Sequence, residues 1–277
     1  RRGRFYDYRG HPLDKPTEFP GHSPALQMLG AFILWFGWYG FNAGSAISIT
    51  GPNQAQVVSL VAVNTTLAAA SACVSALVVN YILEERKTGE GSFSLTYAMN
   101  ATLGGLVSIT GSCGVVEPWA AVLIGFIAGM LYLNTSKLLT RMRIDDVVDA
   151  VPVHMTNGIW GTIAVGLFAS SNRLKMAYGE VGDAGVFMGG NGTLLGCQLI
   201  GILFVVGWVT CLMFPFFCML NYMGWLRSEP ADEVEGLDSR YHTSAKSRDS
   251  IVPVEADDCN NDPSSEMTPN YGEGNRR

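Results

Sequence analysis

The sequence has few charged residues, and long stretches of it have none. Only 15% of its 277 residues are Asp, Glu, Lys or Arg. Five runs are free of them: 19–83, 91–116, 118–136, 150–172 and 184–226. A helix in a soluble protein must present a polar face to water, so helices without charge argue against a soluble domain. A span across a hydrocarbon core of about 30 Å needs about 20 apolar residues. The sequence therefore predicts an all-α integral membrane protein.

Cysteine patterns that would indicate a disulfide framework or a zinc site are also lacking. The six cysteines form no CxxC pair, and most fall in apolar runs, where a thiol packs as a small hydrophobe. No second His, Cys or carboxylate lies at ligand spacing within the predicted spans. We expect no metal and no cofactor.

The acidic balance of the chain comes from its C-terminal part. The net charge is −6, and residues 228–277 hold 12 acidic and 5 basic residues, a net of −7. Such a segment has too little apolar surface to offset chain entropy, so we predict that 227–277 is a mostly disordered acidic tail. The acidity says nothing about a nucleic-acid partner, and none is expected.

The apolar runs predict about six transmembrane helices. Gly51-Pro52, the charged residues 84–87 and Glu117-Pro118 separate some of them, and Pro215 predicts a kink or an end in the last. The predicted spans are 24–46, 56–83, 93–113, 118–139, 147–170 and 192–225. Residues 24–226 thus form the membrane domain, preceded by a loop segment at 1–23.

The orientation of the spans follows from the basic residues, which are enriched on the cytoplasmic side of membranes. One set of alternating connections holds eleven of them, and the opposite set holds only Arg173 and Lys175. We therefore expect both ends of this chain to be cytoplasmic. The chain opens on Arg1 rather than Met and shows no signal-peptide pattern, so we expect a fragment.

The first predicted span carries a stripe of residues spaced by four, three and four positions, which share one helix face. The stripe consists of Leu34, Trp38, Phe41 and Ser45. Trp38 offers a π-face to a cation, and Ser45 offers an acceptor oxygen. Packing against neighbouring helices is the alternative, and the residues alone favour it.

His154 lies about five residues inside the last charge before a long apolar run. An ionisable residue at that depth usually faces a pathway or a polar partner. A neutral imidazole can both donate and accept, which suits a small hydrogen-bonding solute. The alternative is a buried histidine bonded to Asn157 or to a backbone carbonyl.

Three carboxylates, Asp145, Asp146 and Asp149, open the fifth predicted span. Carboxylates at a helix N-terminus interact favourably with the unpaired N–H groups there, and we expect this structural role for all three. Asp149 is the deepest and alone could reach the mouth of a pathway. In the fourth span, Gly125 and Gly129 predict close helix packing, more within one subunit than in a dimer face.

Several segments resemble the ammonium transporter (Amt) family. They are Phe36-Gly37-Trp38-Tyr39-Gly40-Phe41-Asn42-Ala43-Gly44-Ser45, Pro20-Gly21-His22-Ser23, Ile144-Asp145-Asp146-Val147-Val148-Asp149 with His154, and Gly236-Leu237-Asp238. The resemblance runs from about residue 19 to residue 242.

The resemblance implies a fold of eleven spans in two inverted repeats, of which this chain looks like the second repeat plus the last helix. It also implies a homotrimer in the plasma membrane with one narrow apolar pore per subunit, which recruits ammonium and conducts ammonia, with or without a net proton. Because the pathway lies between the repeats, this chain alone would not enclose it.

Residue by residue, the resemblance assigns Trp38 and Ser45 to the recruitment site, Phe41 to the gate and Leu34 to the pore wall. It assigns His154 to the second of two pore histidines and Asp146 to a structural role. Two positions depart from the family pattern: Met155 stands where Gly is common, and Arg240 replaces a threonine that is phosphorylated in some plant relatives.

The sequence leaves three functions to be weighed against one another. The first is an ammonium transporter or channel subunit, and the second is an ammonium-sensing signalling protein on the same fold. The third, an intramembrane enzyme, lacks a nucleophile–base pair or a metal cluster in the sequence, and we expect no enzyme.

Overall fold

A computed structural model describes residues 4–6, 11–17, 21–179, 182–229, 232–233 and 237. Within these residues the secondary structure is helical, apart from an isolated antiparallel bridge between Tyr6 and Pro12. Most of the predicted acidic tail, including Gly236, Asp238 and Arg240, lies outside the described residues.

Each predicted span corresponds to a helix or to a helix pair. The elements are α1 (Pro24–Gly44), α2 (Gln54–Thr88), α3 (Leu95–Thr110), α4 (Pro118–Arg141), the π-helix η1 (Val151–Thr156), α5 (Asn157–Phe168), α6 (Ser171–Tyr178), the 3₁₀-turn η2 (Val186–Met188) and α7 (Thr193–Tyr222). The short helices α6 and η2 lie in what we predicted as a connecting loop. Pro215 lies inside α7, so the expectation that it could end the last helix is wrong.

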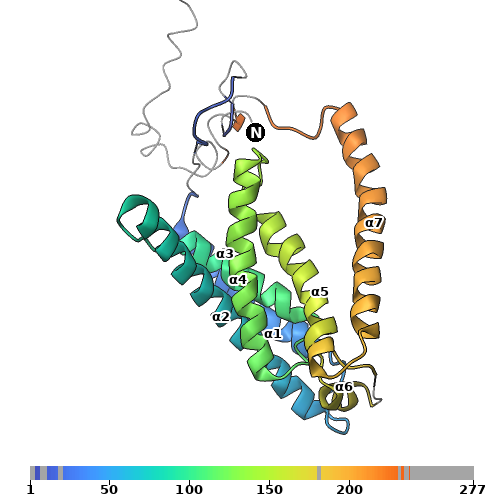
Figure 1. The fold of residues 1–277 in the computed structure, drawn as a ribbon. Coiled ribbons are helices and arrows are strands. Elements are labelled where there is room, and N and C mark those ends of the chain that lie inside the picture. Colours follow the sequence, from blue (N-terminus) through green and yellow to red (C-terminus); the bar gives the residue numbers. More distant parts are fainter. Residues whose placement is uncertain are drawn as a thin grey trace, which may run out of the picture.

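Successive long helices run in alternating directions, as Figure 1 shows. The start of α1, the end of α2, the end of α4 and the end of α7 lie toward one end of the molecule, together with the N-terminal segment. This end carries Arg86, Lys87, Arg141 and Arg227. These helix ends adjoin the connections that the distribution of basic residues predicted to lie on one side of the membrane.

Three of the helices are long and apolar enough to cross a membrane: α2, α4 and α7. The other predicted spans are less uniform. α3 has 16 residues, and the fifth span is divided into the six residues of η1 and the twelve of α5. The structure thus supports an all-helical membrane-type fold with three clear spans.

The centre of the bundle is the packing of α2 against α4, with α3 against both. A Cβ atom added at Gly125 or Gly129 of α4 would collide with the backbone carbonyl of Ala68 or Ala72 of α2. Both α2 residues are fully buried. The two glycines therefore allow the two backbones to approach within the chain, which confirms the predicted packing inside one subunit.

Helix α7 stands beside the rest and packs chiefly against α5 (Figure 1). None of its residues is buried, although it is the most apolar of the three clear spans. A helix that is apolar on all sides belongs in lipid or against other apolar helices.

An ion pair ties the loop before α4 to α6. Arg173 donates from Nε and Nη2 to the two carboxylate oxygens of Glu117 at 2.8 and 2.7 Å. These two hydrogen bonds hold the pKa of the Glu117 carboxyl below its usual range. Nearby, the backbone N–H of Ser170 donates to the carbonyl of Val115 at 2.8 Å. The end of α5 is thereby fixed to the turn between α3 and α4.

Candidate functional site

Helix α1 is attached to α2 through polar side chains. The amide nitrogen of Asn42, a buried residue, donates to the hydroxyl of Thr65 at 2.9 Å, and the hydroxyls of Tyr39 and Thr66 lie 2.7 Å apart. In an apolar surrounding such bonds orient a helix more strictly than apolar contacts do. They fix which face of α1 points away from the bundle.

The indole of Trp38 is held by α3. Its Nε1 donates to Oγ1 of Thr110 at 2.9 Å, and that hydroxyl donates to the carbonyl of Leu106 at 2.8 Å. The indole also makes an edge-on contact with Phe41, with ring centroids 6.0 Å apart. Trp38 is therefore half-buried and fixed, with its ring next to the predicted gate residue.

The rest of the predicted stripe faces outward. Leu34 and Phe41 are 49% and 60% exposed, and Ser45, the residue that caps α1, is exposed too. The Ser45 hydroxyl donates to the carbonyl of Phe41 at 2.8 Å. Its proton is thus engaged, and its lone pairs remain able to accept a hydrogen bond from a cation.

His154 lies in the π-helix η1, and its side chain is exposed. Within the described residues its ring makes no hydrogen bond. The alternative of a buried histidine bonded to Asn157 does not occur, because the His154 side chain is exposed and Asn157 Oδ1 has no hydrogen-bond partner among the described residues. The Asn157 amide instead donates to the carbonyl of Pro152 at 3.1 Å. Met155 is exposed beside it.

Asp146 caps the N-terminus of η1. Its two carboxylate oxygens accept the backbone N–H groups of Ala150 and Val151 at 2.9 and 2.7 Å. The first turn of a helix leaves such N–H groups without partners, and a carboxylate there also meets the positive end of the helix dipole. The contacts are those of the structural role expected for Asp146.

Asp145 and Asp149 both contact side chains of other elements. Asp145 forms an ion pair with Arg4 at 3.0 Å. Asp149 accepts hydrogen bonds from the hydroxyls of Tyr132 and Ser136 at 2.8 and 2.9 Å, and the Asn100 amide lies 3.5 Å away. The backbone of Asp149 is left-handed, with a φ of 55°. Asp149 thus joins η1 to α3 and α4 through side chains, rather than serving helix N–H groups with its carboxylate.

The two groups of predicted site residues lie on elements that both contact α3, namely α1 and η1. Sequence reasoning did not name Thr110 or Tyr132, and it named Asn157 only as a possible partner of His154. Thr110 and Tyr132 contact residues of other elements, and Asn157 makes its contact within an irregular turn. The spacing of residues in the sequence carries no signal for such contacts.

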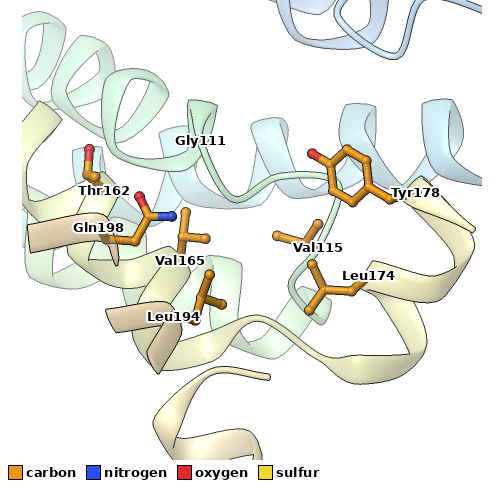
Figure 2. Close-up of a pocket in the computed structure, with 8 residues that line it drawn as sticks. All are labelled: Gly111, Val115, Thr162, Val165, Leu174, Tyr178, Leu194 and Gln198. Atoms are coloured by element: carbon orange, nitrogen blue, oxygen red, sulfur yellow. The ribbon is translucent and has the colours of Figure 1, made fainter. Parts of the chain in front are cut away.

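A separate cavity of about 260 Å³ lies between the end of α3 and the helices α5, α6 and α7 (Figure 2). Its lining is mainly apolar, with Thr162, Gln198 and Tyr178 as polar members. It includes none of the predicted site residues, so it is distinct from the candidate site.

A profile of the Ammonium Transporter Family matches residues 5–247. The chain is 42% identical over 231 residues to "Ammonium transporter 1 member 1" of Arabidopsis thaliana, covering 80% of this chain and 45% of that protein. It is 37% identical over 243 residues to "Ammonium transporter 3" of Dictyostelium discoideum, covering 87% and 54%. The chain thus spans about half the length of the curated relatives that it matches.

Solved structures of similar fold include a "Sensor Amt Protein", with a TM-score of 0.66 and 32% identity over 86% of this chain and 53% of that one. Mep2 of Candida albicans gives a TM-score of 0.67 and 27% identity, covering 79% of this chain and 46% of that one. Sequence and fold agree with each other over most of the chain, and we conclude that it is a member of the Ammonium Transporter Family.

Proposed function

We propose that this chain is part of an ammonium transporter subunit that recruits ammonium beside Trp38 and Ser45 and passes ammonia along Leu34, Phe41 and His154. The observation that carries the proposal is the direction of these side chains. Leu34, Phe41, Ser45 and His154 are exposed, whereas Asn42 and Val153, one position away from Phe41 and His154, are buried. The pathway residues thus turn away from the bundle, toward a surface that a second set of helices would cover.

The stripe on α1 combines two kinds of side-chain chemistry that such a pathway requires. At the end of α1, an indole face and a hydroxyl oxygen suit a cation that keeps part of its water. On the same stripe, Leu34 and Phe41 offer no hydrogen-bond acceptor in their side chains. A desolvated ammonium ion is destabilised there by several kcal/mol, whereas neutral ammonia is destabilised far less.

His154 provides the polar group along this apolar stretch. Its exposed imidazole, free of hydrogen bonds within the described part of the chain, can accept an N–H of ammonia or donate to its lone pair. Sodium and potassium cannot become neutral by losing a proton, so the same stretch excludes them. Whether a proton follows by a separate route is a property of the complete pathway.

The oligomeric state, the membrane and the orientation that we propose follow from the family and from the distribution of basic residues. The subunits form a homotrimer in the plasma membrane. Residues 24–226 form the membrane domain. Residues 1–23 and 227–277 lie on the cytoplasmic side, which is the side of the connections that hold eleven of the 18 basic residues.

The decisive experiment is His154→Ala in the intact gene product. We expect the wild type to restore growth on low ammonium to cells without their own ammonium transporters, and the variant to lose or alter uptake of labelled methylammonium. Uptake by the variant equal to that of the wild type, at equal protein in the membrane, contradicts the pore assignment.

A second function is an ammonium sensor on the same fold, favoured by the likeness to the "Sensor Amt Protein" at 32% identity. The same assay separates the two. A transporter restores growth and takes up methylammonium, whereas a pure sensor binds ammonium, measured by calorimetry on the purified protein, and supports no uptake.

A further inference from the structure

The π-helix that carries His154 changes the direction of that side chain relative to the helix behind it. In a regular α-helix, residues three apart lie on the same face. Asn157 is completely buried, so a regular helix would carry His154 toward the same buried face. A π-helix has more residues in each turn, so each residue advances by a smaller angle. The three-residue step from Asn157 back to His154 therefore ends on the exposed side.

Asn157 makes two hydrogen bonds to carbonyls of this segment. The backbone N–H of Asn157 donates to the carbonyl of His154, and its side-chain Nδ2 donates to the carbonyl of Pro152 at 3.1 Å. The second bond occupies a carbonyl in the irregular first part of the turn. The side-chain amide thereby gives a carbonyl within the π-helix a hydrogen bond from outside the backbone.

Helix α3 supports the Asn157 amide from the other side. A Cβ atom added at Gly104 would collide with Nδ2 of Asn157, so the amide lies directly on the α3 backbone. Asn157 Oδ1 is buried and makes no hydrogen bond among the described residues. The amide thus serves the Pro152 carbonyl and has little room to turn elsewhere.

We propose that Asn157 is a positioning residue: by bonding to the Pro152 carbonyl, and supported by Gly104, it maintains the π-turn that keeps His154 on the exposed face. The importance of this for transport rests on the proposed function of His154. The effect of Asn157 on the π-turn does not depend on that function.

The test uses Asn157→Leu, which keeps the approximate volume of the side chain and removes the donor. The matched control is Asn64→Leu. Asn64 is also completely buried, and its amide donates to two backbone carbonyls, of Cys113 and Val116 at 2.8 and 3.0 Å, but in the turn between α3 and α4. A general loss of stability affects both variants, whereas a change at His154 is specific to Asn157.

The primary measurement is the ¹⁵N NMR signal of the His154 imidazole in the intact, labelled protein, identified by its loss in His154→Gln. We expect Asn157→Leu to shift this signal and Asn64→Leu to leave it in place. Methylammonium uptake per folded molecule should fall about tenfold in Asn157→Leu, the factor that corresponds to one lost buried hydrogen bond.

Gly104→Ala provides a second route that leaves Asn157 in place. The added methyl should displace the amide and reproduce the shifted His154 signal. Gly111→Ala, at the C-terminal cap of the same helix, is the control, because its Cβ would make an ordinary contact of 3.6 Å with Val165.

An unshifted His154 signal in both Asn157→Leu and Gly104→Ala overturns the proposal, and so does an equal shift in Asn64→Leu. A shifted signal together with full uptake by His154→Ala keeps the positioning role and instead refutes the pore function. The two proposals can therefore fail separately.

Discussion

The indole nitrogen of Trp38 donates to the hydroxyl of Thr110, 72 positions along the chain, at a distance of 2.9 Å. This bond fixes a ring of α1 against α3, and the Thr110 hydroxyl donates its own hydrogen bond to the carbonyl of Leu106. The ring that we propose as the recruitment surface is thus oriented by a residue with no direct contact to the solute.

Replacing Thr110 by Val should leave the indole N–H without its acceptor and loosen the ring. Under the proposed function we expect a KM for methylammonium raised several-fold, with a smaller change in maximal rate, because recruitment weakens and the conduction path is intact. Thr102→Val is the control, since among the described residues the Thr102 hydroxyl bonds only to the carbonyl of Ala98 in its own helix. An unchanged KM in Thr110→Val would contradict the orienting role.

Replacing Asp149 by Ala should destabilise the protein more than replacing it by Asn. The alanine leaves the hydroxyl of Tyr132, a completely buried residue, without its acceptor, a loss of about 1–3 kcal/mol. The left-handed backbone, with a φ of 55°, adds strain for Ala that Asn tolerates well. The measurement is the apparent melting temperature in detergent, where equal values for the two variants would refute this account.

Replacing Gly125 by Leu should prevent assembly of the bundle, because even a Cβ atom at this position meets the backbone of Ala68. We expect little folded protein in fluorescence-detected size-exclusion chromatography. Phe126→Leu is the control, since this neighbouring side chain is 44% exposed on the outer face of α4. A normal yield of Gly125→Leu would show that α2 and α4 do not pack as described.

The Glu117–Arg173 pair predicts a stability that falls in acid. The pKa of Glu117 is lowered in the folded protein, because Arg173 donates two hydrogen bonds to its carboxylate. The pair therefore stabilises the fold fully above the ordinary value of 4.5, and this contribution is lost as the pH falls below it toward the lowered pKa.

The effect is modest, at most about 1 kcal/mol, because both side chains are 26% exposed and screened by water. Melting curves of wild type and Glu117→Gln at neutral pH and near pH 3 should converge in acid. A difference that persists unchanged in acid would contradict the assignment.

The six helical stretches follow from the sequence because absence of charge over about 20 residues is a strong and local signal. The exposed direction of Phe41 and Ser45 agrees with the stripe predicted from helical spacing. By contrast, the π-turn at Val151–Thr156 depends on which backbone carbonyl accepts each backbone N–H, and the sequence does not show this. Pro152 alone predicts only a distortion of the helix.

The partners of Asp149 illustrate a second limit. The residue type and its place before a helix favour capping of N–H groups, which is the role that Asp146 in fact has. Asp149 instead contacts Tyr132 and Ser136 of α4, and that choice depends on how two helices cross. Nothing in the spacing of the sequence indicates it.

The segment that carries His154 is fastened at both of its ends. Asp149 binds one end to α4, and the bond from Ser170 to Val115, with the pair of Glu117 and Arg173 beside it, binds the other. A translation of this segment along its axis would break the hydrogen bonds at both of its ends. Rotation of a single exposed ring on this segment, such as that of His154, breaks none of these attachments and occurs on a much shorter timescale than a movement of the segment.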